Sequence, residues 1–562
     1  MGDFINSGPA YVGTGTEDYG YGTLPSIGAS YTSFRATLAD PAAPRRPMIY
    51  AGANDGMLHG FDAHTTGGGQ EIFAYIPNAV FPKLSKLTSP AYTHQYYVDG
   101  ASAVGDVHDG TNWRTVLAGT TGAGARAVFG LDVTNPDDFT DPTKAASKVL
   151  WEFTSADNVS PTYYGADLGY TLAQPSVVLI QDGTSGGSKW AVIVGNGYDS
   201  DNGHAALFVL DALTGAVLQR IVTPDGGTTT NKNGLSTPIA VDTNNDLMVD
   251  TVYAGDLYGN MWKFNMLTGS AGSWPIPTSP LFVACTTSGT TCSTANRQPI
   301  TSKPNVGAVG GPGSDQNGVG RMVYFGTGKY FETGDNIVAT GSQVQTFYGL
   351  WDNGVAITDR ANLQAQTIDY QGFPTTNCGL ATCPVSTKQL RVVSKNPVCY
   401  AATSVSCTTT SPLKKGWALN LLQPDSIARS ERSVSLPLVR RGLVIFSTLI
   451  PDPDPCTPGG KSFLMEVDAL SGGEFYTAPF GTNGDNVVDA ADLILIDGVL
   501  HSAAGVDLDI GVTSTPTVVE STVVDFKNLS GSSGTVGVLP DWIPPVTGST
   551  GSGSRRSWRQ LK

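Results

Sequence analysis

The chain has 562 residues, a formal net charge of −15 and a pI near 4.8. This acidic balance disfavours nucleic acid as a partner, because phosphate binding needs clustered Lys and Arg side chains. No apolar run approaches the roughly 20 residues of a membrane-spanning helix, and Met1–Phe4 carries no signal-peptide features. We expect no membrane-spanning segment, in a protein that is either cytosolic or a fragment whose export signal lies upstream.

Composition indicates an all-β fold. The chain contains 68 Gly and 35 Pro, and its apolar residues come in short runs bounded by Gly, Asn, Asp or Pro. Such runs are typical of many short strands, and long periodic helix candidates are almost absent.

An internal repeat organises the chain. One full copy begins with Met48–Gly52 and ends with a return run at Asp62. Another begins with Thr251–Gly255 and ends at Asn265, and the spacing from its first glycine to the turn glycine and to the final Asp or Asn is identical. Each copy predicts a strand, a glycine turn and a return strand. Degenerate copies begin with residues 116–119, 192–195, 323–326 and 444–447.

A second element precedes these units, namely a short strand opened by Ser/Thr-x-Pro or a close variant. Its seven copies lie at Pro9, Ser102, Pro175, Pro238, Pro304, Pro437 and Pro516. Seven units of uneven length predict a modified seven-bladed β-propeller, a fold that leaves only short, protected strand edges. The first and last copies could share a blade. The alternative, unrelated hairpins in a sandwich, fits the matched offsets less well.

A nine-residue acidic loop precedes the second full copy of the repeat. Its positions 1, 3, 5 and 9 carry side-chain oxygens, on Asp242, Asn244, Asp246 and Asp250. The carbonyl of Met248 lies where a main-chain ligand is usual. Calcium prefers such carboxylate and carbonyl oxygens, so the spacing predicts a calcium loop that leads into a strand. The alternative is an acidic turn, since Asp and Asn are common turn residues.

Six of the seven cysteines form close pairs, Cys285/Cys292, Cys378/Cys383 and Cys399/Cys407. Each pair flanks a few small or polar residues, which predicts hairpins stapled by disulfides in an oxidising compartment. Zinc binding is the alternative, but no CxxC motif and no nearby His support it. Cys456 is either free or lacks its partner in this chain.

We predict one propeller domain over residues 1–545, with insertions near 266–300, 353–415 and 473–510, and a flexible Gly/Ser-rich tail at 546–562. The last insertion resembles a dockerin-type calcium loop that runs into a helix. Its ligand positions fall on Asn483, Asp485, Asp489 and Asp492. Gly481 occupies the first position, where Asp is expected.

Three segments carry a resemblance to a known family, and they are Ala51–Ala63, Phe73–Gly100 and Trp113–Val133. They are similar to the signature of the PilC/PilY family of type IV pilus tip-associated adhesins and biogenesis factors. Gly2–Ser7 resembles the start of that family's C-terminal domain, and Ser557–Arg559 resembles its usual end.

The resemblance implies a modified seven-bladed propeller with Ca²⁺ bound by Asp242, Asn244, Asp246, the Met248 carbonyl and Asp250. It also implies that the protein is not an enzyme but a pilus biogenesis factor and tip adhesin. In such a protein, calcium occupancy would regulate pilus extension versus retraction, surface attachment and twitching motility. The implied partners are minor pilins at the pilus tip and an unidentified host-cell or abiotic surface receptor. The implied location is the cell surface, at the pilus tip or outer membrane, after export through the periplasm.

Two other functions are compatible with a propeller. Periplasmic quinoprotein dehydrogenases, which use pyrroloquinoline quinone and calcium, repeat an Asp-Ala-x-Thr-Gly turn, and Asp211–Gly215 and Asp468–Gly472 fit that local pattern. However, we find neither the adjacent Cys pair nor the regular tryptophan-docking repeats of those enzymes. A non-catalytic outer-membrane assembly scaffold would have no reason to carry a calcium loop or stapled insertions.

Overall fold

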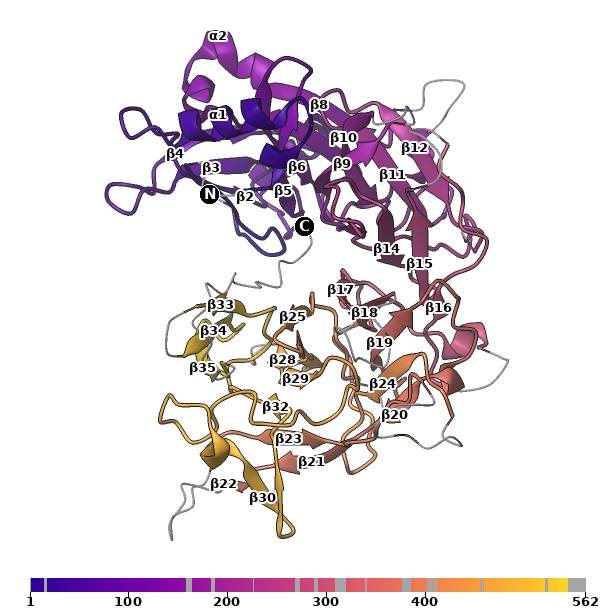
Figure 1. Ribbon diagram of the computed structural model, residues 1–562. Helices are drawn as coiled ribbons and strands as arrows, with labels where there is room; N and C mark the ends of the chain where they lie inside the picture. The colour runs from indigo at the N-terminus through magenta and orange to yellow at the C-terminus, as the bar shows by residue number, and fades with distance from the viewer. Residues whose placement is uncertain are drawn as a thin grey trace. The chain divides into compact units, whose positions relative to one another are not determined.

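The computed structural model describes most of the chain (Figure 1). The described residues are 2–14, 18–157, 164–182, 187–225, 227–267, 273–287, 292–308, 320–338, 341–376, 386–401, 407, 412–454, 457, 459–520 and 524–543. They form two compact units, one from residues 1–257 and 262–279, and the other from residues 258–261 and the chain from 280 onward.

Seven main sheets and two small ones are formed by the described residues, and the first four main sheets have four strands each. The first contains β1 (Ala10–Val12), β2 (Met48–Gly52), β3 (Leu58–Asp62) and β4 (Glu71–Tyr75). The second contains β5 (Ser102–His108), β6 (Trp113–Thr120), β7 (Ala127–Asp132) and β8 (Val149–Thr154). The third contains β9 (Ser176–Gln181), β10 (Ser188–Gly195), β11 (Ala206–Asp211) and β12 (Val217–Val222). The fourth contains β13 (Ile239–Val241), β14 (Thr251–Gly255), β15 (Asn260–Asn265) and β16 (Phe282–Val283).

The remaining sheets are less uniform. The fifth orders β17 (Asn305–Ala308), β18 (Arg321–Gly326), β19 (Thr346–Asp352), β24 (Gly416–Asn420) and β20 (Gln364–Gln366). The sixth orders β21 (Ile368–Gly372), β23 (Leu390–Val393), β32 (Gly505–Val506), β29 (Leu464–Asp468), β26 (Leu443–Ser447) and β25 (Leu438–Arg440). The seventh has only β33 (Thr517–Val519), β34 (Asp525–Ser530) and β35 (Val536–Asp541). Smaller sheets combine β22 (Thr375–Thr376) with β30 (Ile494–Ile496) and β31 (Val499–His501), and β27 (Ile450–Pro451) with β28 (Gly460–Lys461).

Helices are short throughout the described residues. The longest are α1 (Gly28–Leu38) and the 3₁₀ segment η2 (Asn78–Thr88). A 3₁₀ turn, η1 (Tyr21–Thr23), precedes α1. The all-β expectation is therefore confirmed.

The predicted repeat elements coincide with the strands. Each of the seven main sheets contains a strand that begins at, or one residue after, the position predicted from the Ser/Thr-x-Pro element, as with Pro9 before β1 and Pro437 before β25. The two copies near the chain ends do not share a blade, however. β1 pairs with β2 and β33 pairs with β34, so each begins a sheet of its own and that prediction was wrong.

The predicted insertions contain strands as well as loops. Residues within 353–415 supply β20 to the fifth sheet and β21 and β23 to the sixth. The helix expected after the loop at 481 is only a three-residue 3₁₀ turn, η8 (Ala490–Asp492), because β30 begins two residues later. The insertion boundaries remain predictions.

Two of the three predicted disulfides are present, Cys285–Cys292 and Cys399–Cys407. Cys378, Cys383, Cys456 and the predicted tail at 546–562 lie outside the described residues.

A tryptophan joins the second sheet to the third. The indole N–H of Trp151, on β8, donates to the Ala212 carbonyl at 2.9 Å, in the turn after β11. A Cβ atom at Gly130, on β7, would lie 2.4 Å from this ring, and one at Gly215 would lie 2.7 Å from it. Only glycine therefore leaves room for the indole on both sides.

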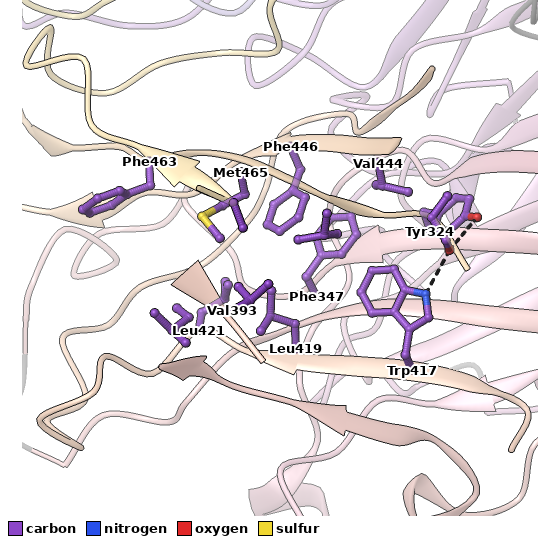
Figure 2. Close-up of a cluster of buried hydrophobic side chains, with 14 of the residues drawn as sticks. Tyr324, Phe347, Val393, Trp417, Leu419, Leu421, Val444, Phe446, Phe463 and Met465 are labelled. Atoms are coloured by element: carbon purple, nitrogen blue, oxygen red, sulfur yellow. Dashed lines mark hydrogen bonds between the residues drawn. The ribbon is translucent and has the colours of Figure 1, made fainter. Parts of the chain in front are cut away.

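The same arrangement joins the fifth sheet to the sixth, inside a hydrophobic core (Figure 2). Trp417, on β24, donates to the Ala469 carbonyl at 3.0 Å, in the turn after β29. Cβ atoms at Gly349 and Gly472 would lie 2.4 and 2.2 Å from the ring. Two tryptophans therefore dock on the two Asp-Ala-Leu turns, a contact that the sequence alone does not predict.

We predict that Trp417→Ala lowers the free energy of unfolding by about 3–5 kcal/mol, the usual cost of truncating a fully buried aromatic side chain. Trp417→Phe should lose less, because it keeps ring packing and the hydroxyl of Tyr324 still donates to the Ala469 carbonyl. Urea unfolding measures both losses. Tyr476→Ala is a matched control, since that side chain is 72% exposed. A loss at Trp417→Ala no greater than at the control would contradict this role.

Candidate metal centre

The predicted calcium loop connects β13 to β14, and hydrogen bonds fix its C-terminal end. The amide of Asp250 donates to the Val241 carbonyl at 3.0 Å, which closes the loop on itself. The amide of Val249 donates to the Leu179 carbonyl at 2.9 Å, and the carbonyl of Asp250 accepts from the amide of Met266 at 2.7 Å. The third and fourth sheets therefore hold the loop from two directions.

The backbone curls around the carboxylate of Asp242. This carboxylate accepts from the amides of Asn244 at 3.1 Å, Asn245 at 2.7 Å and Leu247 at 2.8 Å. Asn245 and Leu247 have φ angles of 64° and 72°, in the left-handed region that side chains other than glycine rarely adopt. Three amides converging on one carboxylate help to offset this unfavourable conformation.

The carboxylate of Asp250 organises the start of the loop from a buried position. It accepts from the amide of Thr243 at 2.7 Å and from the hydroxyl of Thr243 at 2.6 Å. The side-chain amide of Asn244 lies between Asp246, at 3.1 Å, and Asp250, at 3.4 Å. Thr243 could not be predicted from the ligand spacing, because it contributes by holding Asp250 in place and does not occupy a ligand position.

The four predicted side-chain ligands thus belong to one hydrogen-bonded loop. In the part of the chain that the structure describes, no three His, Cys, Asp or Glu side chains come close enough together to hold a metal ion. A cation here would also need Asn244 or main-chain oxygens, such as the carbonyl of Met248. The donor set still fits Ca²⁺, which takes carboxylate, amide and carbonyl oxygens. Each carboxylate also has lone pairs beyond those that the loop amides use.

The hydrophobic residues of the loop pack against a core that contains an aromatic cluster, which we define as Tyr21, Tyr31, Trp113 and Trp190. Leu247 and Met248 are partly buried against the core that contains this cluster. A Cβ atom at Gly20 would lie 3.4 Å from the Leu247 side chain. Leu247 of the loop therefore lies beside Gly20, the residue that precedes η1. The apolar run inside an acidic loop was the sequence signal for this contact.

The loop at 481 repeats much of this geometry. Thr482 donates its amide to the buried carboxylate of Asp492 at 2.6 Å, as Thr243 does to Asp250. The side-chain amide of Asn483 lies 3.1 Å from Asp485, as Asn244 does from Asp246.

Two differences separate the loops. Gly481 stands where the first loop has Asp242, so that carboxylate is absent. The carboxylate of Asp492 accepts three amides instead, from Thr482 at 2.6 Å, Asn483 at 3.2 Å and Asp489 at 3.0 Å. Asp489, a predicted ligand, instead caps η8 by accepting from the amide of Ala491 at 2.7 Å. Burial raises the pKa of Asp492 above its ordinary value.

Comparison with known proteins places these features in a family. Residues 1–376 match the family model described as the PilY1 beta-propeller domain. The chain belongs to the PilY1 family. A type IV pilus biogenesis factor PilY1 homolog of Xylella fastidiosa is 38% identical over 493 residues, covering 84% of this chain. Type IV pilus biogenesis factor PilY1 of Pseudomonas aeruginosa strain UCBPP-PA14 is 35% identical over 525 residues, covering 87% of this chain.

The chain spans 29% and 41% of the lengths of these two PilY1 relatives. It also matches the crystal structure of the Pseudomonas aeruginosa PilY1 C-terminal domain, with a TM-score of 0.71 and 29% identity. This match covers 95% of the chain and all of that domain. The predicted family and fold class, a modified seven-bladed β-propeller, are confirmed. Among the described residues, no helix is both long and apolar enough to cross a membrane.

We predict that Asp242→Ala loosens the loop even without a metal, because the amides of Asn245 and Leu247 lose their acceptor. In chelator-treated protein, hydrogen exchange over residues 243–248 should become about tenfold faster, which corresponds to about 1.4 kcal/mol less protection. Asp485→Ala is the matched control and should leave this segment unchanged. Equal exchange in Asp242→Ala and the unaltered chain would show that the carboxylate does not organise the loop.

Proposed function

We propose that this chain is the calcium-binding propeller region of a type IV pilus biogenesis factor and tip adhesin, and that it is not an enzyme. The observation that carries the proposal is the closed loop between β13 and β14, with four oxygen-bearing side chains, in a member of the PilY1 family. The relatives are named type IV pilus biogenesis factors. Because the chain spans only part of their length, the activity of the whole protein belongs to the proposal.

The proposed ligands are Asp242, Asn244, Asp246, the Met248 carbonyl and Asp250. Three carboxylates within nine residues repel one another, and a bound Ca²⁺ would supply the charge that offsets this repulsion. The free energy of binding then becomes free energy that holds the loop in one conformation.

Leu247 lies beside Gly20, so ordering of the loop by a bound ion could affect the segment that contains Gly20. A loop held in place keeps Leu247 and Met248 packed against the core that also contains Tyr21 of η1 and Tyr31 of α1. We propose that calcium occupancy changes the packing of residues 18–38, and thereby regulates pilus extension, retraction, surface attachment and twitching motility.

Partners and location follow from the same proposal. The partners are minor pilins at the pilus tip and a host-cell or abiotic surface receptor, and the location is the cell surface after export through the periplasm. The disulfides Cys285–Cys292 and Cys399–Cys407 support an oxidising compartment.

A structural role accounts for the turns that resemble those of quinoprotein dehydrogenases. In both turns the alanine carbonyl accepts the N–H of a docked indole, from Trp151 or Trp417. Absence of quinone-type absorbance, and of dye reduction with alcohols or sugars, would favour the pilus function over that enzyme.

Calcium titration by calorimetry into the chelator-treated chain tests the metal site. We expect a single site that is lost in Asp246→Ala and retained in Asp485→Ala. Saturation at about 100 times the dissociation constant should also raise the free energy of unfolding by about 2.7 kcal/mol. Binding that survives Asp246→Ala but not Asp485→Ala would move the site to the 481 loop. No binding at all would refute the calcium proposal.

The regulatory role needs the full-length protein in cells. In a strain that lacks it, the Asp246→Ala protein should fail to restore normal piliation and twitching, although it is produced and exported at the normal level. Asp485→Ala should restore both, because it changes a similar loop outside the proposed site. Normal piliation and twitching with Asp246→Ala would rule out regulation through this loop.

A further inference from the structure

A lysine is buried between two carboxylates in the second compact unit. Lys527, on β34, has no exposed side-chain surface, and neither has Glu466, on β29. The side chain of Asp541, at the end of β35, is 3% exposed. The Nζ atom of Lys527 lies 2.7 Å from Oε1 of Glu466 and 2.7 Å from Oδ1 of Asp541. Three ionisable groups therefore meet at a place that water does not reach.

The pairing of the strands brings these groups together. β34 runs antiparallel to β35, with Lys527 opposite Leu539. Side chains two positions apart on a strand point to the same face, so Lys527 and Asp541 are diagonal neighbours on one face of the sheet. Leu529 and Leu539 share this face, and both are buried. Glu466 reaches the same nitrogen atom from a strand of the sixth sheet.

The second carboxylate oxygen of Asp541 faces a guanidinium group. Oδ2 of Asp541 is buried, and no described residue forms a hydrogen bond with it. Nε of Arg440, on β25, is likewise buried without a hydrogen bond from the described part of the chain, and it lies 3.4 Å from this oxygen. Glu520 and Asp525 hold the other two nitrogens of Arg440. The guanidinium is therefore fixed where it can stabilise negative charge that develops on Oδ2.

This environment disfavours the charged forms of the three groups. Two carboxylates face one ammonium, and removing charged groups from water has a large free-energy cost. Burial is the main reason that the pKa of the Glu466 carboxyl is raised above its ordinary value. This carboxyl is therefore suited to accept a proton and to release it again. Nζ of Lys527 is already in contact with Oδ1, which is one bond away from Cγ of Asp541, so a reaction between them needs little movement.

We propose that Lys527 and Asp541 become joined by an intramolecular amide bond, with Glu466 as the catalytic residue that transfers the protons. A bond forms between Nζ and Cγ, and the bond from Cγ to Oδ1 breaks. Glu466 carries two protons in turn from the ammonium to Oδ1, which leaves as water. Oδ2 carries the negative charge of the tetrahedral intermediate beside Arg440 and becomes the amide oxygen. The reaction is a condensation, so it needs no oxidant, reductant or further reactant.

The amide bond would fasten the last strand of the seventh sheet. It joins residues 14 positions apart on β34 and β35. A cross-link limits the conformations of the unfolded chain, as a disulfide does, but an amide is not broken by reducing agents. The reaction also replaces a buried ammonium and a buried carboxylate by a neutral group. This inference depends on neither calcium binding nor a role in pili.

Mass spectrometry of the folded full chain, after denaturation and reduction of its disulfides, tests the proposal. We expect a mass that is lower than the sequence mass by one water molecule. A protease digest should contain a branched peptide that joins Lys527 to Asp541. Lys189 and Asp211 are an internal control, because their side chains lie 3.0 Å apart but that of Lys189 is 40% exposed. These two residues should remain separate.

Three variants distinguish the bond from a structural ion cluster. Lys527→Arg keeps a cation between the carboxylates but cannot form this amide, so it should have its sequence mass. Glu466→Gln keeps both reacting residues but loses the proton carrier, so it should also have its sequence mass. Asp541→Asn should still react, with ammonia leaving in place of water. Its final mass should then equal that of the reacted original chain.

The full sequence mass in the folded original chain would overturn the proposal, and so would a branched peptide that lacks Lys527. Complete loss of water in Glu466→Gln would refute the catalytic role of Glu466. Circular dichroism of each chain establishes whether it is folded. If Glu466→Gln did not fold, the masses of the original chain and of Asp541→Asn would still decide whether the bond forms.

Discussion

An indole ring can lie flat on a β-strand only where that strand has no side chain beneath it. In this protein the constraint is met twice, once around Trp151 and once around Trp417, and each ring is enclosed by one glycine of its own sheet and one of the following turn. The indole N–H then reaches a turn carbonyl of the next sheet. Because both contacts are buried, consecutive sheets are fixed to one another by packing and by a directed hydrogen bond. The loops between strands are positioned on this frame.

The loop at 242–250 is held in place by these packed sheets. Its end is fixed by main-chain bonds to Val241, Leu179 and Met266, which lie on or next to strands of two adjacent sheets. The loop can therefore hold strained φ angles at Asn245 and Leu247, since the surrounding structure over-determines their conformation. Its apolar centre packs against the core, so the loop is part of the structural interior as well as a candidate ligand site.

Local signals predicted the parts of the fold that depend on local chemistry. One strand in each main sheet starts at or directly after a proline or serine, and glycines occupy the turns of the repeat. These residues act through local backbone preferences, which need no tertiary information. The acidic loop at 242–250 could be recognised for the same reason, since one short segment supplies all of its oxygen-bearing side chains, and its ligand role stays a prediction. The docking of Trp417 on the Ala469 turn could not, because it joins residues 52 positions apart through a shape match that no spacing reveals. The addition of β21 and β23 to the sixth sheet depends likewise on long-range pairing.

The hydrogen bonds inside the 242–250 loop bear on how strongly it could hold a cation. Asp242 already accepts three amides, and Asp250 accepts an amide and a hydroxyl of Thr243. An entering ion would use the lone pairs that these donors leave free, and where it needed the same lone pairs it would have to replace bonds that already exist. Any such replacement would raise the concentration at which half of the sites are filled. If the loop binds calcium as proposed, such competition would place its working range nearer the roughly 10⁻⁴–10⁻³ M of extracellular modules than that of the much tighter cytosolic buffers.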